Sequence, residues 1–279
     1  MKNKMLNHIK RGLALLFGVI FATLNLNNAS AQLLHDGEVL YYRAAYRAKL
    51  VPNTEVGEVT VSTKCDTLNG KEVYRVTGNG RTLPFFRWFF NMNDTYTIWV
   101  DKETKKTQRF ESDIHEDKYT FRSNYRYDWD SMRVHTWSQR RKNTPRTKTM
   151  TLTEESMDAV SLYFNLRSVD LNSFREGEHR RLDMVLEDTI RPLRYRFIKR
   201  DTIKVPRVGK FATMKFACTI GSSEEFSFTD GTEFFIWITE DGNKIPVMLS
   251  SPVRVGEVRA YLRSTEGLKY PLSSLIEKK

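Results

Sequence analysis

Residue types that carry catalysis occur in this 279-residue sequence, but not at the spacings of known catalytic motifs. His115-Glu116-Asp117 lacks the second histidine of an H-E-x-x-H zinc site. Gly78-Asn79-Gly80 lacks the third glycine of a dinucleotide-binding loop, and no G-x-S-x-G nucleophile elbow occurs. We therefore predict no catalytic residue, no metal ligand and no cofactor, and lean towards a protein that is not an enzyme. Catalysis by residues that are far apart in sequence and are brought together by the fold stays an alternative.

The densest group of binding-type side chains is the aromatic run "PFFRWFF", residues 84–90. It lacks strict alternation, so a short helix or a buried plug fits better than a strand. A plug would close one end of an open barrel. A lip would instead contact a lipid, a glycan ring or a membrane interface, with Arg87 beside an anionic group. We favour the plug, because large exposed apolar patches are uncommon on monomeric proteins.

Two similar segments, "YTIWVDKETKKTQRFE" (96–111) and "FFIWITEDGNKIPVML" (234–249), each have a tryptophan in the first strand of an expected hairpin. Neighbouring side chains in a strand point to opposite faces, so Trp99 faces away from Ile98 and Val100. A core position is the favoured interpretation for both tryptophans, and contact with a ligand at a cavity mouth is the alternative. The candidate ligand-binding residues are Phe85, Phe86, Arg87, Trp88, Phe89, Trp99 and Trp237.

The sequence has two cysteines, Cys65 and Cys218, both in expected strands. An oxidising compartment would permit a disulfide between them. Two buried free thiols are an equal alternative, because sequence spacing does not give the distance between their Cα atoms. No histidine stands at zinc-ligand spacing from either cysteine, so no metal site is expected there.

Alternating apolar and polar residues, punctuated by turn signals, predict strands along most of the chain. Asn69-Gly70 is the strongest hairpin signal, since a type I′ turn requires positive φ at both positions. One helix is expected over residues 154–171, capped by Thr153 and carrying an apolar stripe. The predicted fold is mainly β: a curved antiparallel sheet or open β-barrel with one mid-chain helix. Two weakly similar halves, about 37–150 and 177–263, would be joined by that helix.

The first 31 residues have the three parts of a signal peptide: a basic start, an apolar run at 12–24 and the site Ala29-Ser30-Ala31. Cleavage there would leave a single β-rich domain, residues 32–279, in the periplasm or cell envelope. No cysteine lies near the cleavage site, so no lipid anchor is expected. No later apolar run is long enough to span a bilayer, which requires about 20 residues.

Removing the four cations of the leader lowers the formal net charge from +11 to +7. Many basic residues alternate with apolar ones, as on the solvated face of a strand, and this is our favoured interpretation. A surface that faces acidic lipid headgroups or glycans is the alternative. An exported chain rarely meets nucleic acid, so no nucleic-acid partner is expected.

The order of several segments resembles the exported bacterial family catalogued as domain of unknown function 3108. These segments are Gly37-Glu38 with Tyr41, "PFFRWFFNMNDTYTIWVD", "SMDAVSLYFNLRSVDL" with Arg167, "VGKFATMKF" and "WITEDGNKIPV". The resemblance implies an envelope protein of mostly antiparallel β structure. It implies no activity and supplies no catalytic residue.

Our main functional expectation is non-enzymatic binding of an apolar or amphiphilic ligand, a lipid or glycolipid, within the concave sheet. One alternative is a structural or assembly module that binds another envelope protein. A second alternative is a glycan-directed hydrolase, which requires two carboxylates facing one cleft. The sequence does not indicate an oligomeric state.

Overall fold

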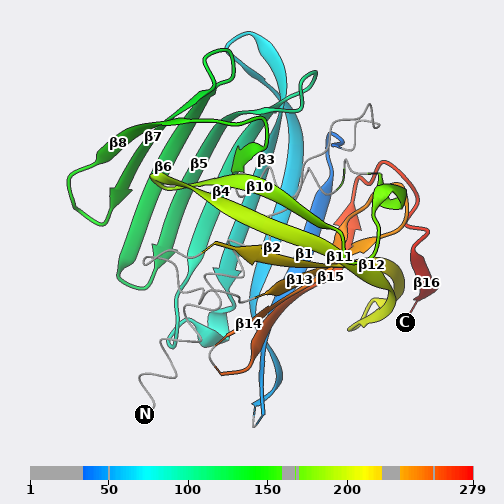
Figure 1. Ribbon diagram of the computed structural model, residues 1–279. Coiled ribbons are helices and arrows are strands. Elements are labelled where there is room, and N and C mark those ends of the chain that lie inside the picture. The colour runs from blue at the N-terminus through cyan, green and yellow to red at the C-terminus, as the bar shows by residue number, and fades with distance from the viewer. Residues whose placement is uncertain are drawn as a thin grey trace.

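The computed structural model describes residues 34–49, 51–158, 167, 170–221, 233–253 and 255–278. Most of them belong to a single, strongly curved sheet, which confirms the predicted β-rich fold (Figure 1). The sheet is antiparallel throughout except where β9 pairs with β10 in parallel. The predicted signal peptide, residues 1–31, lies outside the described residues.

The sheet has sixteen described strands, and two 3-10 turns lie between them. The first eight strands are β1 (Val39–Ala48), β2 (Val51–Leu68), β3 (Lys71–Thr82), β4 (Asn93–Asp101), β5 (Thr107–Glu116), β6 (Tyr119–Asp128), β7 (Arg133–Arg140) and β8 (Arg146–Thr151). The remaining strands are β9 (Ser156–Asp158), β10 (His179–Leu186), β11 (Thr189–Val205), β12 (Gly209–Ile220), β13 (Phe234–Thr239), β14 (Pro246–Pro252), β15 (Glu257–Glu266) and β16 (Leu275–Lys278). The 3-10 turns are η1 (Pro84–Phe86) and η2 (Leu171–Ser173).

Strand order runs from β8 down to β1, then from β15 down to β9, and β16 pairs with β12. Among the described strands, β8 and β9 do not pair, so the sheet is not closed. β1 and β15 join the two runs of strands. The similarity of two halves, and the single-domain division of residues 32–279, stay predictions.

The β2–β3 hairpin turns at Asn69-Gly70, where φ is 53° and 79°. Both values lie in the left-handed region that a type I′ turn requires, so this turn prediction is confirmed. The turn fixes the register that pairs Cys65 with Tyr74. Register in turn decides which residues of β2 and β3 face the interior.

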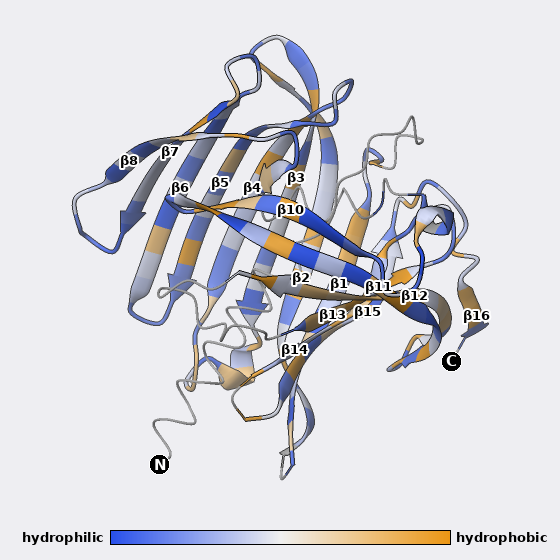
Figure 2. Ribbon diagram, viewed as in Figure 1, coloured by the Kyte–Doolittle hydropathy of each residue, from blue (hydrophilic) through white to orange (hydrophobic). Residues whose placement is uncertain are grey.

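One face of the sheet forms the core, and the alternation of buried and half-buried residues along β4 shows which face it is. Tyr96, Ile98 and Val100 are buried, whereas Thr97 and Trp99 are only half-buried on the other face. Apolar and polar residues alternate in the same way along neighbouring strands (Figure 2). On this inner face Phe110 of β5 stacks on its cross-strand partner Tyr125 of β6, with ring centroids 4.6 Å apart. The curved sheet therefore folds its apolar face inward over packed side chains.

The expected helix over 154–171 needs correction at its beginning. Residues 156–158 form β9, which pairs with Asp183–Val185 of β10. Apolar Met157 is buried there by this pairing, so tertiary contact overrides the local helical pattern. Most of 159–169 lies outside the described residues, and Arg167 within it has helical backbone. Within the described ranges, no helix has the length and apolar character that crossing a bilayer demands.

Candidate functional site

The aromatic run forms a short projecting segment, residues 84–90, which we call the aromatic lip. Phe85 and Trp88 are the most exposed large apolar residues on it, at 77% and 81% exposure. Phe85 packs edge-on against Phe86, and Trp88 packs edge-on against Phe89, with centroids 5.1 and 5.8 Å apart. Phe86 and Phe89 in turn pack against the core. Each exposed ring is thus supported by a second ring that anchors it.

The preferred plug interpretation is therefore wrong for the outer rings. Phe90 is buried, as a plug residue would be, but Phe85 and Trp88 face outward. Pro84 begins η1, and its fixed φ favours the tight 3-10 turn that separates inner from outer rings. The Arg87 side chain is exposed, and its Nε donates to the Thr82 carbonyl at 3.3 Å.

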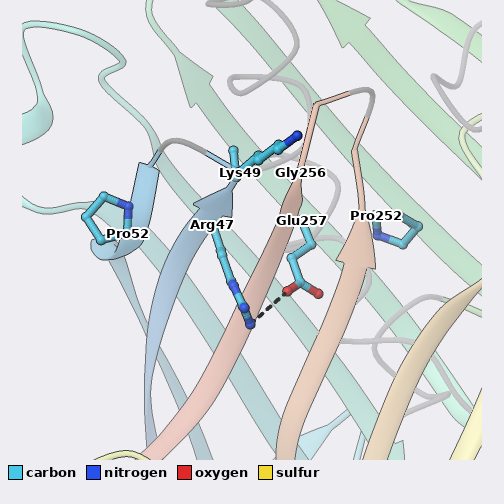
Figure 3. Close-up of a pocket in the computed structure, with 7 residues that line it drawn as sticks. Arg47, Lys49, Pro52, Pro252, Gly256 and Glu257 are labelled. Atoms are coloured by element: carbon cyan, nitrogen blue, oxygen red, sulfur yellow. Dashed lines mark ion pairs between the residues drawn. The ribbon is translucent and has the colours of Figure 1, made fainter.

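A cationic depression lies where β1 turns into β2 and β14 turns into β15 (Figure 3). It is an open hollow of about 830 Å³ that includes Arg47, Lys49, Pro52, Pro252 and Glu257 in its lining. The Arg47 guanidinium points towards Glu257, with Nη1 3.8 Å from Oε1. Within the described residues, Lys49 has no ion-pair partner. We call this depression with its two cations the cationic hollow.

Gly256 closes the wall of the cationic hollow. Its φ is +87°, and an added Cβ would lie 2.1 Å from the Arg47 carbonyl oxygen. Only glycine allows the β14–β15 connection to approach β1 this closely. The same connection is held by Tyr46, whose hydroxyl donates to the Val255 carbonyl at 2.8 Å.

The aromatic lip and the cationic hollow lie at the same end of the strands. Thr82, the last residue of β3, pairs with Gly57, and the Leu83 amide donates to the Val56 carbonyl at 2.9 Å. Pro52 of the hollow is four residues along the same strand, a reach of about 13 Å at the usual rise. The two features can therefore act together on one extended ligand surface.

Trp99 and Trp237 lie elsewhere and make matching contacts within the protein. The Trp99 indole donates to Asp66 on β2, and the Trp237 indole donates to Asp201 on β11, both at 3.3 Å. In each case the indole reaches across one intervening strand, β3 or β12. A cation lies over each ring, Arg109 at 5.2 Å from Trp99 and Lys215 at 4.9 Å from Trp237.

These contacts show a repeated structural arrangement rather than an assembled site. Trp237 is buried and Trp99 is half-buried, and both indole N–H groups already have acceptors. The structure does not bring either tryptophan to the aromatic lip. A ligand-contact role for Trp99 or Trp237 stays a prediction.

Cys65 and Cys218 are both free thiols, Cys65 exposed on β2 and Cys218 buried on β12. The possible disulfide is therefore absent from the structure, because the two strands lie on different parts of the sheet. Burial raises the pKa of the Cys218 thiol well above its usual value, which keeps it protonated.

A pair of carboxyls that the sequence did not single out, Asp94 and Glu116, lies beneath the aromatic lip. We call it the carboxyl pair. Asp94 is fully buried; its Oδ1 accepts from the His115 amide at 2.9 Å, and its Oδ2 has no hydrogen-bond partner. Burial, followed by the neighbouring Glu116, raises the pKa of Asp94 to about 8. Burial also raises the pKa of Glu116 to about 7.

This pair does not have the arrangement of a glycosidase. Retaining enzymes hold two carboxyls about 5 Å apart, and inverting enzymes hold them further apart across an accessible cleft. Here Asp94 is fully buried, so no accessible cleft leads a glycan to both carboxyls.

A second shallow cleft, of about 270 Å³, lies on the outer polar face of β4–β7. Trp137 lines it together with Glu111 and Asp113. Both carboxylates are already paired, Glu111 with Asn124 at 2.8 Å and Asp113 with Arg122 at 3.2 Å. These internal contacts account for the polar groups of the cleft without a ligand.

The sequence contained a signal for Asp94 and none for the cationic hollow. Asp94 is an acid in the core-facing phase of an alternating strand, the same phase as Tyr96 and Ile98. Glu116 stands in the incomplete zinc motif His115-Glu116-Asp117, which gives no signal for a carboxyl pair. Arg47 and Lys49 are ordinary basic residues of a hairpin, and only the fold brings them near the lip.

Comparison with known proteins gives a family match and a fold likeness. The family model described as protein of unknown function, DUF3108, matches residues 41–263. None of the curated proteins matches the chain.

Among solved structures, a beta-barrel-like protein of domain of unknown function DUF1849 from Brucella abortus is similar with a TM-score of 0.55 and 11% identity. The alignment covers 85% of this chain and 100% of that one, and it indicates a shared fold. The Mycobacterium tuberculosis lipoprotein LppX aligns over 98% of this chain and 100% of its own, with 9% identity and a TM-score of 0.24. That score is too low to indicate a common fold.

Proposed function

The chain belongs to the DUF3108 family of proteins of unknown function, and from that premise we propose that it binds acidic lipid surfaces without catalysing a reaction. The binding surface is the strand end that carries the aromatic lip and the cationic hollow. The ligand class is an amphiphile with an anionic headgroup. The proposal includes export to the cell envelope, where such surfaces are available to the protein.

The exposure of Phe85 and Trp88 carries the proposal. Leaving a large apolar side chain in water forgoes about 1.5–3 kcal/mol relative to burying it. Two supported rings on one projecting segment therefore present apolar area that a lipid interface can cover. Tryptophan suits this role because its ring is amphipathic and settles at the headgroup level of a bilayer.

The charge around the lip selects among lipids. Arg47, Lys49 and Arg87 are exposed at this end, and a basic residue near an acidic bilayer surface contributes about 1 kcal/mol. Binding to neutral lipid would be stabilised only by apolar contact with the exposed rings. Binding to an acidic lipid such as phosphatidylglycerol would be stabilised by this apolar contact and also by attraction to the basic residues.

Co-sedimentation with vesicles of phosphatidylglycerol and phosphatidylethanolamine, compared with phosphatidylcholine, tests the proposal. We expect the protein to bind the acidic vesicles and to lose binding in the double variant Phe85→Ser/Trp88→Ser. Ile276→Ser is the matched control, because Ile276 is also exposed, at 58%, but lies on β16 near the opposite strand ends. No binding to acidic vesicles, or an equal loss in Ile276→Ser, would overturn the proposal.

A further inference from the structure

The carboxyl pair joins two segments that meet beneath the aromatic lip. Asp94 is the second residue of β4, four residues after the end of the aromatic lip, and Glu116 is the last residue of β5. The His115 amide donates to Asp94, so the backbone of β5 holds one carboxylate oxygen. The other oxygen of Asp94 is buried and lacks a partner. A buried carboxylate oxygen without a donor is unfavourable unless the group is protonated or shares a proton.

The backbone on both sides of the pair anchors the lip. Met92 forms a β-bridge with Glu116, and the Asp117 amide donates to the Asn91 carbonyl at 2.7 Å. In return the Asn91 amide donates to the Asp117 carboxylate at 2.9 Å. Met92 and Thr82 also exchange hydrogen bonds, at 3.0 and 3.2 Å, which closes the base of the loop. Separation of Asp94 from Glu116 would therefore pull on the hydrogen bonds that hold the lip.

The other groups near the pair do not neutralise it. Among the described titratable groups, Asp113 acts on Asp94 and Asp117 acts on Glu116, and both add negative charge. Both carboxyls of the pair lie near the buried hydroxyl of Tyr96, which Tyr119 and Tyr125 also approach. Asp113 is held by Arg122 and His115, at 3.2 and 3.0 Å. Arg81 on β3 binds Glu58, and Arg87 in the lip binds the Thr82 carbonyl. No cation in this set offsets two negative charges on the pair.

We propose that the carboxyl pair is a proton-operated latch, which holds the aromatic lip while the two carboxyls share a proton and loosens it when both are ionised. With one proton, the pair carries a single charge and the Met92–Glu116 bridge stays closed. With none, two like charges in a buried site repel each other and the bridge opens. Burial places this change near neutral pH, with the pKa of Asp94 at about 8 and that of Glu116 at about 7. The effect on lipid binding rests on the proposed function. A loosened lip loses more conformational entropy when its rings bind to a lipid surface, so lipid binding becomes weaker.

Hydrogen exchange read by mass spectrometry tests the latch without any lipid. The reporters are the Thr82, Met92 and Asp117 amides, all of which donate hydrogen bonds at the base of the lip. At pH 8.5 we expect faster exchange in the wild type than in Asp94→Asn, which cannot ionise at that position. At pH 6 the two proteins should exchange equally. The doubly ionised form is rare at pH 6, which lies below both pKa values, and predominant at pH 8.5, which lies above both. The difference in exchange should therefore appear between pH 6 and pH 8.5.

Three further variants separate the latch from nearby groups. Glu116→Gln should protect the same amides at pH 8.5, and it serves as the second test if Asp94→Asn folds poorly. His115→Gln should leave the pH dependence unchanged, because its side chain does not belong to the pair. Asp113→Asn should shift the pH dependence slightly to lower pH without abolishing it, because the Asp113 charge helps to raise the pKa of Asp94. The Glu103 and Thr104 amides, bound to Asp101 at the opposite strand ends, are internal controls. Equal exchange of wild type and both pair variants at pH 8.5 would overturn the proposal.

Vesicle binding across the same pH range distinguishes the two proposals. Wild-type binding to phosphatidylglycerol vesicles should weaken between pH 6 and pH 8.5, and Asp94→Asn should retain it at pH 8.5. Absence of vesicle binding at both pH values, with the exchange difference intact, would overturn the proposed function and keep the latch. Vesicle binding with no exchange difference would overturn the latch and keep the proposed function.

Discussion

The guanidinium of Arg167 holds the carboxylate of Glu38 at two points in the interior of the protein. Nη1 contacts Oε1 and Nη2 donates to Oε2 at 2.8 Å, and both residues are 1% exposed. Arg167 Nε also donates to the Asn243 carbonyl at 3.0 Å. One side chain thereby connects the mid-chain segment to the beginning of β1 and to the β13–β14 turn.

Removing one partner of this buried pair should destabilise the protein strongly. Arg167→Met leaves the Glu38 charge buried without its partner, and we expect a loss of about 3–5 kcal/mol in the free energy of unfolding. Urea unfolding followed by circular dichroism measures it. Glu277→Gln is the control, since its pair with Lys210 is largely exposed and should change stability by at most about 0.5 kcal/mol. Similar values for the two variants would contradict the structural role of Arg167.

The carboxyl pair predicts that stability falls as pH rises. The folded pKa of Asp94, about 8, lies above its ordinary value of 3.8, so between these pH values the folded protein holds a proton that the unfolded chain releases. The stability contributed by this group is then complete below about pH 4 and is lost as pH rises to about 8, by a few kcal/mol in order of magnitude. Asp94→Asn should flatten this fall. Urea midpoints at pH 5 and pH 8.5 measure it, and a wild-type midpoint that rises with pH would contradict the prediction.

From the tryptophan contacts we predict that substitution of Trp99 or Trp237 lowers the stability of the protein and leaves its binding to lipid vesicles unchanged. Trp237→Phe keeps a buried ring but removes the donor to Asp201, which should cost about 1 kcal/mol. Trp99→Phe should have a smaller effect, because Trp99 is only half-buried. Thermal unfolding and vesicle co-sedimentation measure the two properties. Lost vesicle binding in a variant of unchanged stability would instead assign that tryptophan to the ligand surface.

Rings of the aromatic lip should differ sharply in their contribution to stability. Phe90 is 3% exposed, so Phe90→Ala should cost about 3–5 kcal/mol. Phe85→Ala should stay within about 0.5 kcal/mol, because its side chain already faces solvent. Urea unfolding of both variants checks the division between anchoring and exposed rings. A large loss in Phe85→Ala would show that the ring is covered in solution.

The cationic hollow depends on Gly256 for its shape. Gly256→Ala should destabilise the β14–β15 connection by more than Gly37→Ala, although both glycines have a φ near +85°. At Gly37 an added Cβ meets nothing within 4 Å, so only the backbone strain of about 1 kcal/mol applies. At Gly256 the added Cβ also collides with the Arg47 carbonyl. Equal melting temperatures for the two variants would contradict this close approach.

Local sequence patterns predicted the strands more accurately than they predicted the ligand surface. The alternation of β4 and the Asn69-Gly70 turn depend on neighbours in sequence, and both appear as expected. The β9 strand depends on pairing with β10, so its helical pattern was misleading. The exposure of Phe85 and Trp88 depends on how the aromatic lip packs on the folded sheet. The amino-acid composition of the lip does not reveal this packing. Arg47 and Lys49 were missed for the same reason.

The junction of β1 with β15 has a consequence for how the chain folds. Val39 pairs with Glu266, so the first described strand finds one of its two partners only near the end of the chain. Contacts between residues so far apart in sequence make folding slow, because a long loop must close before the contact forms. Until β15 is available, β1 has an open edge that could pair with another chain. A truncation that removes β15 should therefore yield aggregates rather than a smaller folded unit.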